Sequence, residues 1–448
     1  MTTIAERVTP IRADTYVTQL LNKVNQKTIC VGVVGLGYVG LPFLVEKAKV
    51  DLNVIGFDCQ AKRVEAIRRK ESYINDVSNQ DLIDIFKKGK VSVTTDFAYL
   101  SKADAIIICV PTPLDKNLCP DLRHVEAVSH EIAKYLRPGQ LVSLESTTYP
   151  GTTSDVIQPI LEATGLKSGK DFFLAHSPER VDPGNARYTT KNTNKIVGAD
   201  DPDSLHIAKV FYQLAIDTVV TVTNTKTAEM VKVYENTYRA VNIALANEIA
   251  LLCHRMGIDV WEMLDAAFTK PFGIMPFYPG PGVGGHCIPV DPHYLEWKAK
   301  AYHFNTRFIT LAGEINRQMP LFVTNRIANI LNERKKAVNG AKILILGMAY
   351  KENLPDYRES PSFEIWQLLH EAQAQLTYYD PYIPELSFVN ERQCSTPLTE
   401  AMLENVDLVV IATGHRNVDY QKVLKHAPCI FDTRNVYRGI HSDKIIRL

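Results

Sequence analysis

The first half of the chain alternates short apolar runs with segments of helical periodicity. Apolar runs at 29–34, 105–110 and 141–147 have strand length, and each leads into a turn. The first is followed by glycines, a helix-like segment and a second strand-like run that closes on Asp58. A further run at 172–180 leads into a polar loop. Because strands that alternate with helices are typical of parallel sheets, this half predicts a doubly wound domain.

The middle of the chain has a different pattern. From about Thr227 to Met256 the sequence keeps helical periodicity without glycine or proline, which predicts one helix about 45 Å long at ~1.5 Å per residue. Such a helix is long enough to bridge two domains. A loop rich in proline and glycine follows at 270–292, and a second helical stretch begins near Thr306. Pro320 lies in that stretch and predicts a kink or a boundary.

From Gly340 the strand pattern of the first half begins again. The segment AKILILGMAY predicts a strand that ends in glycine, LTYYD ends in Asp380 as NVIGFD ends in Asp58, and 406–414 is similar to 103–112. We interpret this as an internal repeat at the level of the fold. Since the second copy lacks the full GxGxxG of the first, we expect it to bind something other than a dinucleotide.

The predicted fold class is α/β, with two doubly wound Rossmann-like domains joined by a helical central domain that contains the long spanning helix. The chain is too long for a single core, and two or three domains are expected. We place an N-terminal extension at 1–27, a dinucleotide-binding domain at 28–215, a central helical domain for dimerisation and catalysis at 216–335, and a C-terminal ligand-binding domain at 336–448.

Composition excludes several classes of protein. Lys and Arg number 50, as do Asp and Glu, so no global positive field is available to hold nucleic acid or an anionic membrane. The N-terminus has no apolar core typical of a secretory signal, and no apolar run approaches the length of a membrane span. We therefore expect a cytoplasmic protein whose partners include neither nucleic acid nor a membrane.

The segment GLGYVG carries the strongest local signal. Gly35 permits a tight turn, Gly37 lets the backbone approach a pyrophosphate, and Gly40 allows close packing of helix on strand. The motif follows a strand, opens a helix and has Asp58 about 20 residues further on, which favours a dinucleotide site over an ordinary turn. An acid there accepts hydrogen bonds from the adenosine ribose and repels a 2′-phosphate, so NAD is favoured over NADP. Two nearby cations weaken that preference slightly, Lys62 and Arg63.

The chain has eight cysteines and no CxxC pair, and we expect most of them to be buried thiols. Cys287 is different because it lies in GPGVGGHCIPVD, where glycines allow backbone and ligand to approach closely. We interpret it as a nucleophile. A metal site is the alternative, but the candidate ligands lack the usual zinc spacing: His286, Cys287, Asp291 and His293. Lys232 and Asn236 share one helix face and could stabilise an oxyanion, although alone they are more often a solvated stripe.

Together these segments resemble the UDP-glucose/GDP-mannose dehydrogenase family over nearly everything after residue 28. The matching motifs are VGVVGLGYVGLP, VPTP at 110–113, EST at 145–147, SPER at 177–180, KxxxN at 232–236, GGHCIPVD at 284–291 and GMAYKENLPDYRESPS at 347–362. The resemblance implies NAD as cofactor, a UDP-sugar as substrate bound by the C-terminal domain, a homodimer, and a role in surface polysaccharide synthesis.

The resemblance also implies a reaction, the four-electron oxidation of a C6 hydroxyl to a carboxylate. Cys287 matches the catalytic cysteine, which traps the aldehyde as a thiohemiacetal that is then oxidised to a thioester. Lys232 and Asn236 match the pair that stabilises the oxyanion, and Asp291 matches a carboxylate that works with Lys232 as acid and base. Thr147 matches a hydroxyl that holds a catalytic water.

The resemblance also implies which residues bind the cofactor and the substrate. Glu179 matches a glutamate near the thioester. The residues implied to bind the cofactor are Gly35, Gly37, Tyr38, Val39, Gly40, Asp58, Arg63, Pro111, Thr112, Thr147 and Arg358. The residues implied to bind the substrate are Glu179, Arg180, Val181, Lys232, Asn236, Gly284, Lys351 and Arg434. No residue is expected to bind a metal.

Two departures from the UDP-glucose members narrow the substrate. Those members carry a second glutamate soon after SPE and an arginine upstream of the cysteine loop, whereas here the segments are SPERVDPGN and TKPFGIMPFYPGPG. Both resemble the branch that acts on UDP-N-acetylhexosamines. Glycines near the cysteine would also leave space for a 2-acetamido group. We expect UDP-N-acetylglucosamine as substrate, with UDP-N-acetylmannosamine and UDP-glucose as alternatives.

Two other classes of protein stay open. A cysteine hydrolase that uses Cys287 with His286 or His293 needs no dinucleotide site, so GxGxxG and Asp58 speak against it. A nucleotide-binding regulatory protein without activity gives no reason for a thiol in the glycine loop.

Overall fold

The computed structural model describes residues 15–74, 76–182, 187–388 and 391–448. These residues form two compact units, 1–234 and 235–448, with the boundary inside the long helix α8 (Thr225–Met256). That helix confirms the long uninterrupted helix that the sequence predicts. Among the described residues, no helix combines the length and apolar character needed to span a bilayer.

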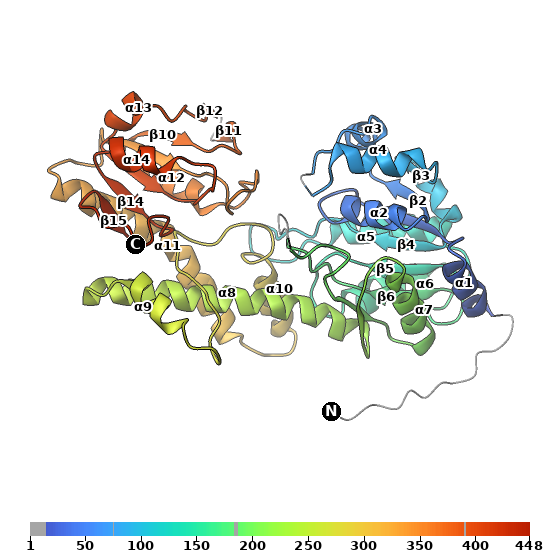
Figure 1. Cartoon of the computed structure of the whole chain (residues 1–448). Helices are drawn as coiled ribbons and strands as arrows, with labels where there is room; N and C mark the ends of the chain where they lie inside the picture. The colour runs from blue at the N-terminus through green and yellow to red at the C-terminus, as the bar shows by residue number, and fades with distance from the viewer. Residues whose placement is uncertain (1–14, 75, 183–186, 389–390) are drawn as a thin grey trace. The chain divides into compact units, whose positions relative to one another are not determined.

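Unit 1 is built on an eight-stranded sheet with the order β3-β2-β1-β4-β5-β6-β7-β8 (Figure 1). The strands are β1 (Cys30–Val34), β2 (Asn53–Phe57), β3 (Val91–Thr94), β4 (Ala105–Ile108), β5 (Leu141–Leu144), β6 (Phe173–His176), β7 (Lys195–Gly198) and β8 (Val219–Val222). All neighbouring strands are parallel except β6 and β7, which are antiparallel. The first six strands follow the order expected of a Rossmann domain.

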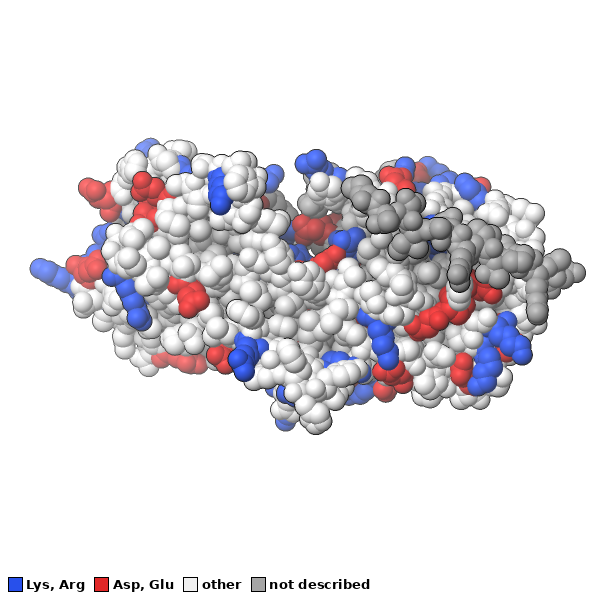
Figure 2. Space-filling model, turned by 90° about the horizontal axis from the view of Figure 1, so that it is seen from below, with Lys and Arg blue, Asp and Glu red and all other residues white. Residues whose placement is uncertain are grey.

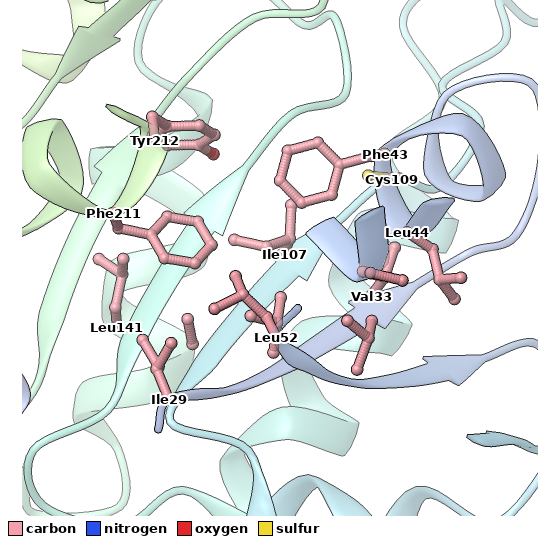
Figure 3. Packing of buried hydrophobic residues seen from close by; sticks show 14 of the residues in the cluster. Ile29, Val33, Phe43, Leu44, Leu52, Ile107, Cys109, Leu141, Phe211 and Tyr212 are labelled. Carbon is pink, nitrogen blue, oxygen red and sulfur yellow. The ribbon is translucent and has the colours of Figure 1, made fainter. Parts of the chain in front are cut away.

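The helices of unit 1 connect these strands. They are α1 (Tyr16–Asn25), α2 (Gly40–Lys49), α3 (Ala61–Arg68), α4 (Asn79–Lys87), α5 (Arg123–Tyr135), α6 (Gln158–Glu162) and α7 (Pro202–Gln213), with a 3₁₀ turn η1 (Phe97–Lys102) and a π turn η2 (Thr153–Ile157). In Figure 3, Ile107 of β4 packs with Phe43 of α2 and with Phe211 and Tyr212 of α7. Ile106 and Ile108 are equally buried outside that cluster, which shows that the sheet is covered on both faces.

Helix α1 was not predicted and lies within the expected N-terminal extension. It packs Val17, Leu20, Leu21 and Val24 into the core of unit 1. Lys23 forms an ion pair with Asp104 at 2.7 Å. The i, i+3, i+4, i+7 spacing of its buried residues is the helical signal that could have revealed it.

Unit 2 contains a five-stranded parallel sheet with the order β10-β9-β13-β14-β15. Its strands are β9 (Lys342–Leu346), β10 (Gln375–Tyr379), β13 (Leu408–Ile411), β14 (Ile430–Asp432) and β15 (Ile445–Arg447), with a separate hairpin of β11 (Glu385–Phe388) and β12 (Glu391–Cys394). Its helices are α9 (Val260–Ala267), α10 (Asp291–Lys300), α11 (Arg307–Glu333), α12 (Pro361–Glu371), α13 (Glu400–Glu404) and α14 (Tyr420–His426). The predicted fold class, two Rossmann-like sheets and a helical central region, is confirmed.

Pro320 does not end a helix, contrary to one of the two alternatives predicted for it. Helix α11 runs through it from Arg307 to Glu333. The proline removes one N–H from the helical hydrogen bonds, but it is buried beside Met319 and Val323 in the core of unit 2. Tertiary packing therefore overrides the local preference.

Candidate active site

The GLGYVG turn of unit 1 has the geometry of a dinucleotide-binding loop. Gly35 has φ of 92°, and its N–H donates to the Phe57 carbonyl at 2.8 Å. A Cβ at Gly35 would lie 2.6 Å from the Cys109 carbonyl oxygen, and one at Gly40 would lie 1.8 Å from the Gly35 carbonyl oxygen. Both positions therefore require glycine to bring helix α2 against the turn.

Gly37 differs because a Cβ there would meet nothing within 4 Å. Tyr38 beside it is 43% exposed, and Val39 precedes α2 without a side-chain cap. The loop thus leaves open space at Gly37, in front of the first N–H groups of α2, and the Val39 side chain does not cap those groups. This arrangement fits the pyrophosphate of a dinucleotide.

Asp58 follows β2 and is 4% exposed. Its carboxylate accepts hydrogen bonds from the N–H groups of Leu36 at 3.0 Å and Gln60 at 2.8 Å. Arg63 contacts the same carboxylate at 3.3 Å. Asp58 therefore fixes the glycine turn, and Arg63 lies beside the position expected for the adenosine ribose.

The ends of β4 and β5 carry the next candidate cofactor residues. The Thr112 hydroxyl donates to the Thr147 carbonyl at 2.7 Å, and the Ser146 hydroxyl donates to the Val110 carbonyl at 2.7 Å. Pro111 lies in the same segment. The structure thus brings Pro111, Thr112 and Thr147 together at the carboxyl edge of the sheet, where doubly wound folds bind ligands.

Glu179 follows β6 at the same edge, and both of its carboxylate oxygens have partners. One oxygen accepts the N–H groups of Arg180 and Val181, each at 2.8 Å, and the other lies 3.3 Å from the Lys195 ammonium. Burial acts to raise the pKa of Glu179, and the charge of Lys195 is the largest of several effects that together outweigh burial. The N–H donors and the charge of Lys232 act in the same direction, and the pKa of this carboxyl lies below its ordinary value.

Unit 2 brings three candidate catalytic residues together. The Asn236 side chain, fully buried on α8, donates to the Asp291 carboxylate and accepts from Arg239. Asp291 begins α10, and its N–H donates to the Cys287 carbonyl at 2.8 Å. The turn before α10 therefore fixes the exposed Cys287 relative to Asp291, and Asp291 relative to Asn236.

Exposure alone does not single out Cys287. Only Cys109, Cys253 and Cys429 are buried, whereas Cys59 and Cys394 are exposed like Cys287. The expectation that most cysteines are buried is therefore wrong.

The glycines of the cysteine loop serve close packing. A Cβ at Gly280 would lie 2.6 Å from the Arg434 guanidinium, and one at Gly284 would lie 2.5 Å from the Glu359 carbonyl oxygen. A Cβ at Gly285 would lie 2.7 Å from the Tyr350 ring. The interpretation that these glycines leave space for a 2-acetamido group is therefore wrong, because neighbouring groups of unit 2 already fill that space.

The candidate nucleotide-binding cations of unit 2 lie on two loops. Arg358 forms a two-point ion pair with Asp356, at 2.8 and 2.5 Å, and its carbonyl accepts the Gly285 N–H at 3.2 Å. Arg434 follows β14 and donates to the Ala412 carbonyl at 2.8 Å. Burial lowers the pKa of Arg434 to about 10, so it is still a cation at neutral pH. Lys351 lies on the loop that leads to Arg358.

The metal alternative and the hydrolase alternative both depend on the histidines near Cys287. The His293 ring contacts the Glu296 carboxylate at 2.9 Å and faces Arg317 at 3.5 Å. Burial and the charge of Arg358 lower the pKa of His286. Within the part of the chain that the structure describes, no group of three or more His, Cys, Asp or Glu side chains is arranged to hold a metal ion.

The sequence matches three profiles of one family in chain order. They are the NAD binding domain of the UDP-glucose/GDP-mannose dehydrogenase family over residues 28–216, its central domain over 226–318, and its UDP binding domain over 344–439. The chain belongs to the UDP-glucose/GDP-mannose dehydrogenase family. It is accordingly an NAD-dependent nucleotide-sugar dehydrogenase, which confirms the predicted family, cofactor and class of enzyme.

Individual relatives cover most of the chain. A UDP-N-acetyl-D-glucosamine 6-dehydrogenase of Pseudomonas aeruginosa is 36% identical over 391 residues, which cover 87% of this chain and 91% of that protein. A UDP-N-acetyl-D-mannosamine dehydrogenase of Pyrococcus horikoshii is 34% identical over 415 residues, which cover 91% and 96% of the two chains. The solved structure of a UDP-D-ManNAc dehydrogenase from Pyrococcus horikoshii matches with a TM-score of 0.85 at 33% identity, covering 94% of this chain and 99% of that chain.

Proposed function

We propose that this enzyme oxidises the C6 hydroxyl of a UDP-N-acetylhexosamine to a carboxylate through a covalent intermediate on Cys287. The observation that carries the proposal is the cluster in unit 2, where Asn236 donates to Asp291 and Asp291 is hydrogen-bonded to the turn of Cys287. A nucleophile, an amide donor and a carboxylate in this order suit an acyl transfer to and from a thiol. Bound NAD supplies the hydride acceptor for each oxidation.

The protein residues then have separate tasks in binding the cofactor. The Gly35–Gly40 turn, with Tyr38 and Val39, holds the pyrophosphate through backbone N–H groups. Asp58 and Arg63 lie toward the ribose. The other proposed contacts of the cofactor are Pro111, Thr112, Thr147 and Arg358.

The first covalent step joins Cys287 to the substrate. The thiolate attacks the C6 aldehyde carbon, a C–S bond forms, and the carbonyl oxygen becomes an oxyanion. The Lys232 ammonium and the Asn236 amide stabilise that oxyanion, and Asp291 with Lys232 transfers the protons of the alcohol steps. After the second oxidation the intermediate is a thioester on Cys287.

Hydrolysis releases the product. Thr147 holds a water, which attacks the thioester carbon, and Glu179 takes up a water proton. The C–S bond breaks, and the carboxylic acid leaves while the thiol is restored. On the substrate side, Lys351 and Arg434 pair with the pyrophosphate of UDP, and the proposed contacts of the sugar are Arg180, Val181 and Gly284.

We propose UDP-N-acetylglucosamine as the preferred substrate, ahead of UDP-N-acetylmannosamine and well ahead of UDP-glucose. The support comes from the relatives of known name, which act on the first two sugars, and from SPERVDPGN, of which residues 183–185 lie outside the described residues. The test is kcat/KM for NADH formation with these three sugars and with GDP-mannose. A preference for UDP-glucose would overturn the substrate assignment and leave the four-electron reaction standing.

Cofactor preference is a separate test of the same function. Because Asp58 places a negative charge toward the ribose, we expect a strong preference for NAD over NADP. Equal turnover with NADP would contradict the role proposed for Asp58.

We further propose that the active enzyme is a homodimer joined through α8. On this helix Tyr238, Leu245, Leu252 and Met256 follow each other at intervals of seven, seven and four residues, and all are exposed. The opposite face is already buried at Ala240, Ala244, Ala250 and Cys253. A solvent-facing stripe of this length is best covered by the same stripe of a second copy.

The charged side chains on the face of the molecule in Figure 2 are dispersed and do not gather in one patch. Lys and Arg are interspersed with Asp and Glu in Figure 2, and wide uncharged areas separate them. Leu245→Glu with Leu252→Glu should give a monomer by light scattering at micromolar concentration, whereas Leu118→Glu, at an exposed leucine of unit 1, should not. A wild-type monomer would contradict the proposal.

A further inference from the structure

An unusual group of three charges lies at the carboxyl edge of the sheet in unit 1. Lys195, the first residue of β7, is only 4% exposed. Its ammonium forms ion pairs with Glu145, which follows β5 and has no exposed surface, and with Glu179 at 3.3 Å. A buried ammonium is costly to desolvate, and here two carboxylates compensate for it.

The strand order explains how the lysine reaches Glu179. Strands β5 and β6 are parallel neighbours, so the residues that follow them, Glu145 and Glu179, meet at one edge. Strand β7 is antiparallel to β6, with His176 opposite Gly198. Extending that register by three residues places Lys195 opposite Glu179. The reversal of β7 therefore directs a cation toward an edge where the parallel strands end.

The two carboxylates of this group differ in their exposure to solvent. Glu145 is fully buried at one end, where it forms an ion pair with Lys195 and also faces Lys47 and Tyr212. Glu179 is at the other end, 16% exposed at its side chain, and its second oxygen is held by backbone N–H groups of Arg180 and Val181. The lysine thus links an interior carboxylate to one that is accessible to a ligand.

We propose that Lys195, held in place by Glu145, is a positioning residue that keeps Glu179 ionised and oriented for hydrolysis of the thioester on Cys287. This inference rests on the proposed function and adds two residues to it. Neither residue touches the reacting atoms in this account. A carboxylate takes up a proton from water only when it is ionised, and a fixed ammonium beside it favours that state.

The expected pH dependence also reflects the other groups that face the three charges. Around Glu179 these are Lys195, Glu145, Lys232 and Cys109. Around Lys195 they are Glu145, Glu179, Tyr212, His176, Cys109 and the buried Lys47, whose pKa burial lowers to about 7. Burial lowers the pKa of His176 to about 3, so it stays neutral. Burial also raises the pKa of Cys109, and that thiol carries no charge at neutral pH. Lys232 also faces Glu179 and keeps its charge when Lys195 is replaced.

A stability role alone would predict something else. Replacing a whole buried ion pair with neutral groups is often harmless to folding, whereas removing one partner is strongly destabilising. A single Lys195→Met variant therefore mixes two effects, since it leaves Glu145 unpaired. The double variant Lys195→Met/Glu145→Gln removes both charges and separates folding from function.

The experiment uses the full-length enzyme with NAD and UDP-N-acetylglucosamine. Rapid-quench intact-mass analysis measures the substrate covalently bound to the protein, and steady-state NADH formation gives kcat and KM. The double variant should keep the wild-type Tm within a few degrees, lose at least about tenfold in kcat with little change in KM, and accumulate the covalent adduct. The acid limb of its pH profile should move to higher pH, because Glu179 then ionises less readily. Lys191→Met, an exposed lysine of the preceding segment, should match the wild type.

Two outcomes would overturn the inference. A double variant that turns over like the wild type without accumulating the adduct would show that the three charges serve folding only. A Lys195→Arg variant that folds, keeps the charge and still accumulates the adduct to the extent of the double variant would show that hydrolysis does not depend on the charge at this position. Failure of the proposed function is distinguishable, because the wild type would then form one NADH per substrate or form no adduct at Cys287.

Discussion

The two sheets of this chain build the same turn with the same atoms. Gly35 follows β1 with φ of 92°, and Gly347 follows β9 with φ of 90°. The Gly35 N–H donates to the Phe57 carbonyl at 2.8 Å, and the Gly347 N–H donates to the Tyr379 carbonyl at 3.0 Å. The internal repeat inferred from sequence thus extends to individual hydrogen bonds.

The aspartate after the neighbouring strand is used differently in the two copies. Asp380 accepts donors from five residues, Met348, Ala349, Tyr382, Ile383 and His415. A carboxylate has about four lone-pair sites, so these donors leave Asp380 no capacity for a ligand. Asp58 has three donors, Leu36, Gln60 and Arg63. Only the first copy has an acid with capacity left for a ribose.

The helix after the turn differs as well. In unit 1, α2 begins at Gly40, directly behind the turn, and presents N–H groups to a phosphate. In unit 2, α12 begins only at Pro361, and the intervening loop carries Lys351 and Arg358. In the proposed function, the same turn therefore serves two kinds of phosphate site, one built from backbone dipoles and one from cationic side chains.

The largest effect should come from Cys287, the proposed nucleophile, which lies outside both of the turns compared above. Cys287→Ala should lower uronate formation by at least about a thousandfold, because no thioester can form. Calorimetric titration should show NAD and UDP binding within about twofold of the wild type. Full uronate production by this variant would mean that another group performs the covalent step.

Adding a methyl group to the GLGYVG turn tests whether NAD binding depends on the first of the two turns alone. Gly40→Ala should weaken NAD binding by at least about a hundredfold and lower Tm, since its Cβ would lie 1.8 Å from a backbone oxygen. Gly37→Ala is the matched control, because its Cβ meets nothing within 4 Å. It should keep the wild-type Tm and still bind NAD about tenfold more weakly, as the methyl occupies the pyrophosphate's approach. Weakened UDP binding in either variant would contradict the assignment of the two nucleotides to separate turns.

The second copy has its own test. Lys351→Met should weaken UDP binding by about tenfold, the value of one charge-assisted contact, without changing NAD affinity. Lys342→Met, an exposed lysine on β9, should change neither affinity. Unchanged UDP binding in Lys351→Met would contradict the proposal that cationic side chains bind the UDP pyrophosphate in unit 2.

Much of this arrangement could be predicted from sequence because the signals are local. The glycine turn, Asp58, the long helix and the repeat at Asp380 all depend on spacing within one segment. The neighbours of Cys287 are another matter, since Asn236 meets Asp291 only through the tertiary fold. The family resemblance implies a catalytic role for each of the two residues, but their hydrogen bond has no local sequence signal.

What sequence reasoning missed depends on strand direction and on packing. Lys195 joins Glu179 because β7 is antiparallel to β6, and nothing in the sequence of β7 reveals its direction. The loop glycines were interpreted as open space, whereas Gly280 is filled by Arg434, which is far away in sequence. Glycine permits close approach as readily as it leaves room, and only the partner decides which applies.

The last prediction concerns stability rather than binding or activity, and it contrasts two buried carboxyls, one in each unit. Glu229 on α8 accepts from the Gly151 and Thr153 N–H groups at 2.5 and 2.8 Å, yet burial raises its pKa to about 7. Burial raises the pKa of Asp380 too, but His415 and the backbone donors outweigh it and lower the pKa. The folded chain therefore holds an extra proton at Glu229 between about pH 4.5 and 7, and stability falls as the pH rises through that range.

Glu229→Gln should remove that loss, which is roughly 3 kcal/mol above pH 7 and corresponds to several degrees in Tm. Asp380→Asn should act in the opposite sense, because a carboxyl with a lowered pKa stabilises the fold above its unfolded pKa and loses this contribution as the pH falls. Scanning fluorimetry from pH 5 to 8 should show the Glu229→Gln variant gaining on the wild type with rising pH. The deficit of Asp380→Asn should stay constant across this range and shrink only below about pH 4, because the lowered pKa of Asp380 and its ordinary value of 3.8 both lie below pH 5. A Glu229→Gln curve that runs parallel to the wild type would show that Glu229 does not titrate differently in the folded chain.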